Sequence, residues 1–347
     1  MNLTVAAWWS REAIKYTIAF IIFLLLARIL WIVGAGIYRH FFPPAPPPPT
    51  VLFGKLPLLT FPISSKPDQT FNFSLELPEQ ELPKTSTILP LFATQARRPY
   101  FGALEQTRKT AKALGFGERE ESLSPSIYRF RKKEVEGISL DINIITGVFA
   151  ISSNLSQNQD LLNLRPPSGE VTTSIVRAYL SSADLFPADF SQGKASTQFL
   201  QNQAGNLIQA PSLSEANLVR VDLFRQSYND LPTVTPMPGK ATVWFILSGE
   251  ERDRQIIAGE YHYFGVDQQT SSTYPIKTAN QAWEELKNNQ GAFIFLPGQT
   301  NIVVRRVYLA YYDSPEFQEF FQPVFVFEGD NGFVGYVPAV TSEYYGK

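Results

Sequence analysis

Histidine is the side chain best suited to acid–base catalysis near neutral pH, and this sequence contains two, His40 and His262. A catalytic base needs a nucleophile within hydrogen-bonding reach, and the sequence has no GxSxG or HExxH motif. His262 stands between Tyr261 and Tyr263 in EYHYFGV, a pattern typical of a strand. We therefore expect a half-exposed strand histidine, and we predict no catalytic residue.

Paired carboxylates are the other feature that could support chemistry, because glycosidases use two of them across the scissile bond. The sequence offers three groups of neighbouring acids, which are Glu250, Glu251 and Asp253, then Glu284 and Glu285, then Glu316 and Glu319. Each group falls in a predicted polar helix or turn, where charges form a solvated face. Enzymatic activity is therefore not expected.

Metal and cofactor sites are not expected either. The chain lacks cysteine, which excludes disulfides, thiolate zinc sites and cysteine nucleophiles. The stretch EGDNGF, Glu328 to Phe333, lacks the spaced acids of a calcium loop and instead predicts a type I′ hairpin turn. The net charge of −2 argues against nucleic-acid binding, which requires a basic surface.

The elements that must position any functional residue begin with an apolar segment over residues 16–38, after a short tail of residues 1–15. Its length suits one membrane-spanning helix, and we expect an uncleaved single-pass anchor in the cell membrane. Basic residues are nearly equal in number on the two sides of this segment, so they do not decide its orientation in the membrane. The low charge of the remaining chain favours an extracytoplasmic soluble region.

Arg28 lies inside this segment, where a charge costs about 2.5–3.5 kcal/mol on insertion scales. Two interpretations remain open. Arg28 either pairs with an acidic or polar group on a partner's transmembrane helix, or it extends toward one membrane interface. Gly34 is a candidate packing contact for such a partner, although the glycines here do not form GxxxG.

Residues 39–62 follow as a proline-rich tether, because FFPPAPPPPT favours a polyproline II rod. Its last part, residues 51–62, is expected to pack as extended chain on the first domain.

The rest of the chain predicts an α+β fold, in which a helix is packed on an antiparallel sheet and this unit is duplicated. Phe71, Phe73, Leu75 and Leu77 alternate with polar residues as in a half-buried strand. Helices are expected over 103–114 and from Val171, and another begins at Thr278. The three predicted modules span residues 63–165, 166–273 and 274–347.

The last module is rich in aromatic residues that could serve as exposed anchors for a partner. These candidates are Tyr308, Tyr311, Tyr312, Phe317, Phe320 and Phe321.

The same module resembles the C-terminal part of the YycH/YycI regulatory proteins of Gram-positive bacteria. The similarity lies in YPIKTANQAWEELKNN, VYLAYYDS, FFQPVFVFEG and YVPAV. The domain is also similar to PepSY-type modules. This resemblance implies a non-enzymatic extracytoplasmic regulator that contacts a sensor histidine kinase through its transmembrane helix.

We therefore expect a membrane-anchored regulatory or scaffold protein that acts by contact with a membrane or envelope protein. The alternative is a cell-envelope enzyme or carbohydrate-binding protein whose site is assembled from distant residues.

Overall fold

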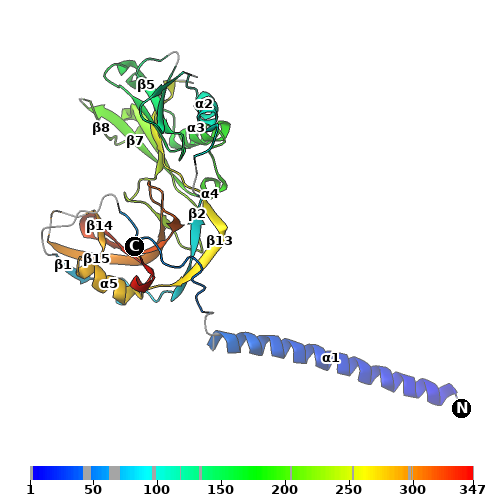
Figure 1. Cartoon of the computed structure of the whole chain (residues 1–347). Helices are drawn as coiled ribbons and strands as arrows, with labels where there is room; N and C mark the ends of the chain where they lie inside the picture. The colour runs from blue at the N-terminus through cyan, green and yellow to red at the C-terminus, as the bar shows by residue number, and fades with distance from the viewer. Residues whose placement is uncertain are drawn as a thin grey trace. The chain divides into compact units, whose positions relative to one another are not determined.

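A computed structural model describes residues 3–41, 48–61, 71–95, 99–117, 119–132, 135–203, 205–251, 254–295, 298 and 300–346. Contacts between residues divide the chain into two compact units, Met1–Pro48 and Pro49–Lys347. The larger unit is α+β, as expected (Figure 1).

The first unit is one long helix, α1, which runs over Leu3–Phe41. Within it, Glu12–Tyr38 has a mean hydropathy of 2.6 and no buried residue, so it is long and apolar enough to cross a membrane. The helix also includes most of the predicted tail, because the residues before Glu12 contain no glycine or proline that would break it. The proline block at 43–47 lies outside the described residues.

The larger unit contains a nine-stranded antiparallel sheet built from two meanders that meet at their last strands, and the first two strands of the second meander are in exchanged order. The first meander contains β3 (Glu120–Ser122), β4 (Ile127–Arg131), β5 (Ile138–Asn143) and β6 (Phe149–Ser153). The second contains β7 (Ala195–Gln203), β8 (Asn206–Gln209), β9 (Leu218–Leu223), β11 (Val243–Leu247) and β12 (Ile256–Tyr261). The strand β6 pairs with β12 and joins the two.

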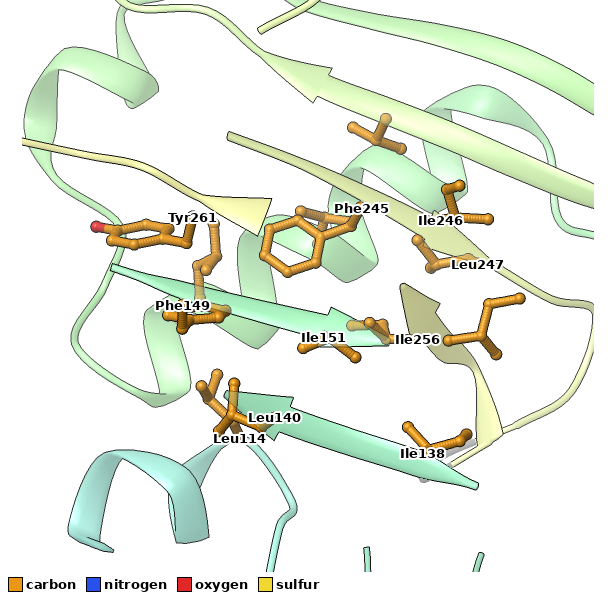
Figure 2. Close-up of a cluster of buried hydrophobic side chains, with 14 of the residues drawn as sticks. Leu114, Ile138, Leu140, Phe149, Ile151, Phe245, Ile246, Leu247, Ile256 and Tyr261 are labelled. Atoms are coloured by element: carbon orange, nitrogen blue, oxygen red, sulfur yellow. The ribbon is translucent and has the colours of Figure 1, made fainter. Parts of the chain in front are cut away.

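The helices α2 (Ala103–Ala113) and α3 (Gly169–Ser182) cover one face of this sheet (Figure 1). Their apolar side chains and the inward-facing strand residues form one buried core, part of which Figure 2 shows. Phe149 of β6 stacks on Tyr261 of β12, with ring centroids 5.0 Å apart. The shared core explains why the two meanders form one sheet. Three short helices lie in the loops that connect the elements of this sheet. They are η1 (Gln159–Leu162), α4 (Ala188–Ser191) and η2 (Leu213–Glu215).

A second group of sheets contains both early and late strands. The six-stranded sheet has the order β1 (Asn72–Leu75), β15 (Asn301–Tyr312), β17 (Pro323–Gly329), β18 (Val334–Pro338) and β14 (Ala292–Phe295), with β10 (Thr233–Val234) also on β15. The three-stranded sheet contains β13 (Val266–Pro275), β2 (Ile88–Thr94) and β16 (Phe320–Phe321). The helix α5 (Ala279–Lys287) packs on the six-stranded sheet, and η5 (Ser342–Tyr344) follows it near the end.

This pairing differs from three consecutive modules over 63–165, 166–273 and 274–347. The strand β1 of the first predicted module and β10 of the second both pair with β15. The strand β2 of the first module lies between β13 of the second and β16 of the third. Their apolar faces explain the exchange, since Phe73 of β1 stacks on Phe293 with centroids 6.0 Å apart. Residues 51–62 are predicted to pack on the first domain, but their described part, 51–61, packs on C-terminal elements. Leu56 is fully buried, and its amide donates to the carbonyl of Tyr344 at 2.8 Å.

The predicted turn at EGDNGF is present between β17 and β18. Asn331 and Gly332 have φ values of 56° and 79°, and the Phe333 amide donates to the Asp330 carbonyl at 3.2 Å, within the short 3₁₀ turn η4 (Asp330–Gly332). Two consecutive positive φ angles define type I′, whose twist matches an antiparallel hairpin.

The helix α5 begins at Thr278, as the sequence predicts, and its first turn is closed by a capping box. The Thr278 hydroxyl accepts a hydrogen bond from the Gln281 amide, and the Gln281 side chain accepts one from the Thr278 amide. We expect Thr278→Ala to lower the free energy of unfolding by about 1 kcal/mol, measured by urea denaturation. Ser168 is a matched control because it occupies the same position before α3 without a side-chain capping bond. An equal loss in Ser168→Ala would contradict this account.

Candidate functional site

The most concentrated ionisable groups in the described part of the chain form a buried cluster around Arg225. This Arg225 cluster contains Asp189 of α4, Tyr228, Tyr263 and Asp313, which follows β15. Arg225 Nη1 lies 3.2 Å from Asp189 Oδ2, and Nη2 donates to the Phe264 carbonyl at 2.8 Å. Asp189 also accepts hydrogen bonds from the hydroxyls of Tyr228 and Tyr263, each at 3.1 Å. Every oxygen of this carboxylate therefore has a protein partner.

Asp313 approaches the guanidinium from the six-stranded sheet. Its Oδ1 lies 2.8 Å from Arg225 Nε in an ion pair that is not aligned as a hydrogen bond. Its Oδ2 accepts a hydrogen bond from the Thr242 hydroxyl at 3.1 Å, just before β11 of the nine-stranded sheet. The Arg225 cluster thus links the nine-stranded sheet to the strand β15.

The electrostatics of the Arg225 cluster follow from burial of two carboxylates with one guanidinium. Burial lowers the pKa of Arg225, but attraction to Asp313 and Asp189 outweighs it, so the pKa lies above its ordinary value. Burial raises the pKa of the Asp313 carboxyl, and Arg225 only partly opposes this effect. The pKa values of Tyr228 and Tyr263 are raised first by burial and then by the Asp189 charge.

The cavity beside the Arg225 cluster is too small to admit a substrate. The adjoining cavity has a volume of about 10 Å³, lined by Arg225, Asp313 and Tyr312 among others. Such a space holds about one water molecule. We therefore interpret these groups as a structural junction, not as a catalytic centre.

The candidate aromatic anchors of the last module are mostly core residues. Tyr311, Tyr312, Phe320 and Phe321 are buried, which corrects the expectation that they are exposed. The physical reason is that β15 and β16 lie within sheets, and Tyr311 stacks on Phe321 with centroids 5.2 Å apart.

Two of the six aromatic residues remain in contact with solvent. Tyr308 is half-buried, and its hydroxyl donates to Glu328 at 2.7 Å. Phe317 is 42% exposed and packs edge-on against Phe264. A surface of several aromatic anchors is therefore not formed here.

Residues considered for catalysis have ordinary structural roles. His262 Nδ1 lies 2.9 Å from the Pro315 carbonyl, and the ring is partly exposed at the end of β12. Glu284 and Glu285 pair with Lys287 and Lys277. Asp253, the third acid of its group, lies outside the described residues.

One Ser-x-x-Lys spacing, at Ser191 and Lys194, also occurs in the chain. This spacing can supply a nucleophile and its base in acyl-transfer enzymes. The Ser191 hydroxyl instead donates to the Ala188 carbonyl at 2.6 Å, and Lys194 is exposed. Ser191 therefore lacks the contact with Lys194 that would activate it.

Arg28 lies in the middle of the potential membrane span of α1. It is 16 residues after Glu12 and 10 residues before Tyr38, or about 24 Å and about 15 Å along the axis. Glu12 is already paired with Lys15 at 2.8 Å. No acidic residue of α1 is therefore available to Arg28 among the described side chains.

Arg28 and Gly34 are not on the same face of α1. A helix turns about 100° per residue, so Gly34 lies about 120° around the axis from Arg28. Ala35 lies within about 20° of it and is the small residue that shares its face. A partner helix that contacts Arg28 would meet Ala35 more readily than Gly34.

No protein-family model matches this chain, and no curated protein matches it. Among solved structures, it is similar to an uncharacterized protein from Eubacterium rectale, with 13% sequence identity and a TM-score of 0.44. The match covers 80% of this chain and 91% of that one. What this protein does must therefore be inferred from its own residues.

Proposed function

We propose that this is a single-pass protein of the cell membrane, which acts by contact with another membrane protein and not by catalysis. Its larger unit is extracytoplasmic, and its role is that of a regulator or scaffold. The observation that carries the proposal is Arg28, a cation near the middle of an apolar span that contains no available acid.

The position of Arg28 favours a partner over extension of its side chain to an interface. The hydrocarbon core is about 30 Å thick, so a residue at its centre is about 15 Å from either surface. Intramembrane charges usually face protein and pair with a polar or charged group. The occupant of this face is therefore a transmembrane helix with an acidic or strongly polar side chain.

A second copy of this chain fits the same face poorly. A symmetric pair would bring two guanidinium groups together in a low dielectric, where like charges repel strongly. An acidic partner relieves both the charge and the lost hydration of Arg28. The resemblance of residues 274–347 to YycH/YycI proteins supports a sensor kinase as the class of partner.

Photo-crosslinking within the native membrane tests this function. A photoreactive residue at Ala35 shares the face of Arg28, while one at Leu30 lies about 160° away around the axis and is the matched control. We expect Ala35 to capture a polytopic membrane protein, identified by mass spectrometry, and Leu30 to capture mainly lipid. Equal capture at both positions, or lipid alone at Ala35, would overturn the proposal.

A further inference from the structure

A surface cleft of about 370 Å³ lies between α2, the β5–β6 turn and the end of α3. Its floor is apolar and includes Ala103, Ile142 and Leu185, all buried. This volume falls within the range of small-molecule sites, which combine an apolar floor with a few polar groups.

Four polar side chains line the same cleft without a hydrogen bond to any described residue. They are the Tyr100 hydroxyl, the Gln106 amide, the Thr110 hydroxyl and the Asp184 carboxylate. Gln106 and Asp184 are exposed, whereas Thr107 beside them donates to the Ala103 carbonyl. The free groups include both donors and acceptors, with Asp184 as the single charged one.

One aromatic ring, that of Tyr100, lines the cleft. Tyr100 is 57% exposed and lines it, and Phe101, the next residue, is fully exposed. Neither ring packs in the core of the unit. The Tyr100 ring is therefore available to cover the apolar face of a bound molecule.

The chemistry of these groups selects among ligand classes. An anion would be repelled by the Asp184 carboxylate. An ammonium group has no acceptor atom, so it could not accept a hydrogen bond from the Gln106 amide or from the two hydroxyls. A sugar hydroxyl both donates and accepts, and a sugar ring has a C–H face that can lie on an aromatic ring. We propose that this cleft binds a short neutral saccharide.

Saturation-transfer NMR with the full chain in lipid nanodiscs tests the proposal. The probes are maltotriose, cellotriose and triacetylchitotriose, with empty nanodiscs as the blank and an uncharged acetylated trialanine amide as the peptide comparison. We expect at least one saccharide to bind. Tyr100→Ala and Asp184→Asn should each weaken that binding about tenfold or more, as loss of one good contact does.

The controls separate the cleft from general surface effects. Phe317→Ala removes an exposed aromatic ring outside the cleft and should leave binding unchanged. The substituted cleft residues are exposed, so thermal unfolding of the variants should match the parent. The proposal is overturned if no saccharide binds, if the peptide binds equally well, or if the cleft variants bind normally. Arg28→Leu should not alter this binding, so the saccharide site and the membrane partner fail independently.

Discussion

Replacing Arg225 with leucine is expected to lower the free energy of unfolding by about 3–5 kcal/mol. The substitution leaves Asp189 and Asp313 buried without their cation. Removing one partner of a buried ion pair destabilises a protein by about this amount, because an uncompensated charge stays buried. Urea unfolding followed by tryptophan fluorescence measures the change, since Trp244 and Trp283 lie in the folded unit.

Arg306→Leu is the matched control for this substitution. Arg306 lies 3.4 Å from Glu328, but its side chain is 68% exposed, so the loss should stay within about 1 kcal/mol. Similar losses in the two variants would show that the Arg225 cluster does not hold the sheets together.

The carboxyl of Asp313 gives the Arg225 cluster a pH dependence of definite sign. Its folded pKa is raised by burial, so the folded protein holds this proton more tightly, and stability falls as pH rises above about 4. Asp313→Asn removes this effect while keeping an acceptor for Thr242. Its stability relative to the parent should therefore increase from pH 4 to pH 7, measured by urea unfolding.

Asp330→Asn provides a control of opposite sign. Arg305 lowers the pKa of the exposed Asp330 carboxyl, so its contribution is lost as pH falls. The stability of this variant relative to the parent should decrease as pH rises. The same pH trend in both variants would contradict the assignment of the two shifts.

Arg28→Leu should make membrane insertion more favourable by about 3–4 kcal/mol, the sum of the arginine cost and the leucine gain. An assay of inserted against translocated segment measures this change. The same substitution should reduce recovery of the membrane partner at least about tenfold, because the paired acid would be left buried without a cation.

Arg28→Lys separates charge from shape. Lysine keeps the cation but not the planar fork of donors, so partner recovery should lie between that of the parent and that of Arg28→Leu. If Arg28→Leu inserts better and still recovers its partner fully, the arginine does not recognise that partner.

Local patterns in the sequence predict local structure well. Thr278 correctly identifies the start of α5, and the glycine at 115 marks the end of α2, where its φ of 79° satisfies the turn. Asn331 and Gly332 identify their hairpin for the same reason, since few residues tolerate positive φ. These signals lie within a few neighbouring positions.

Sheet membership and the Arg225 cluster could not be predicted in this way. Nothing near Phe149 reveals that its strand pairs with β12, more than 100 residues later. Arg225 follows Leu223 and Phe224 directly after β9, and no acid stands within two residues of it in the sequence. Its ion pairs depend on two acids brought from α4 and the end of β15. Alternation likewise cannot tell a strand covered on both faces from one covered on a single face, so the sequence around Tyr311 and Tyr312 does not reveal that both are buried.

The parallel pairing of β1 with β15 has a consequence for biosynthesis. Asn72 pairs with Asn301, so the partner of β1 is synthesised 229 residues later. At a synthesis rate of about 5–20 residues per second, the pairing residues of β15 are made roughly 10–50 s after those of β1. During this interval the apolar segment of α1 has already been available for capture by the membrane. With α1 inserted as proposed, the nascent chain would be tethered to the bilayer well before its larger unit can close. An incomplete sheet edge would then not diffuse freely among other nascent chains.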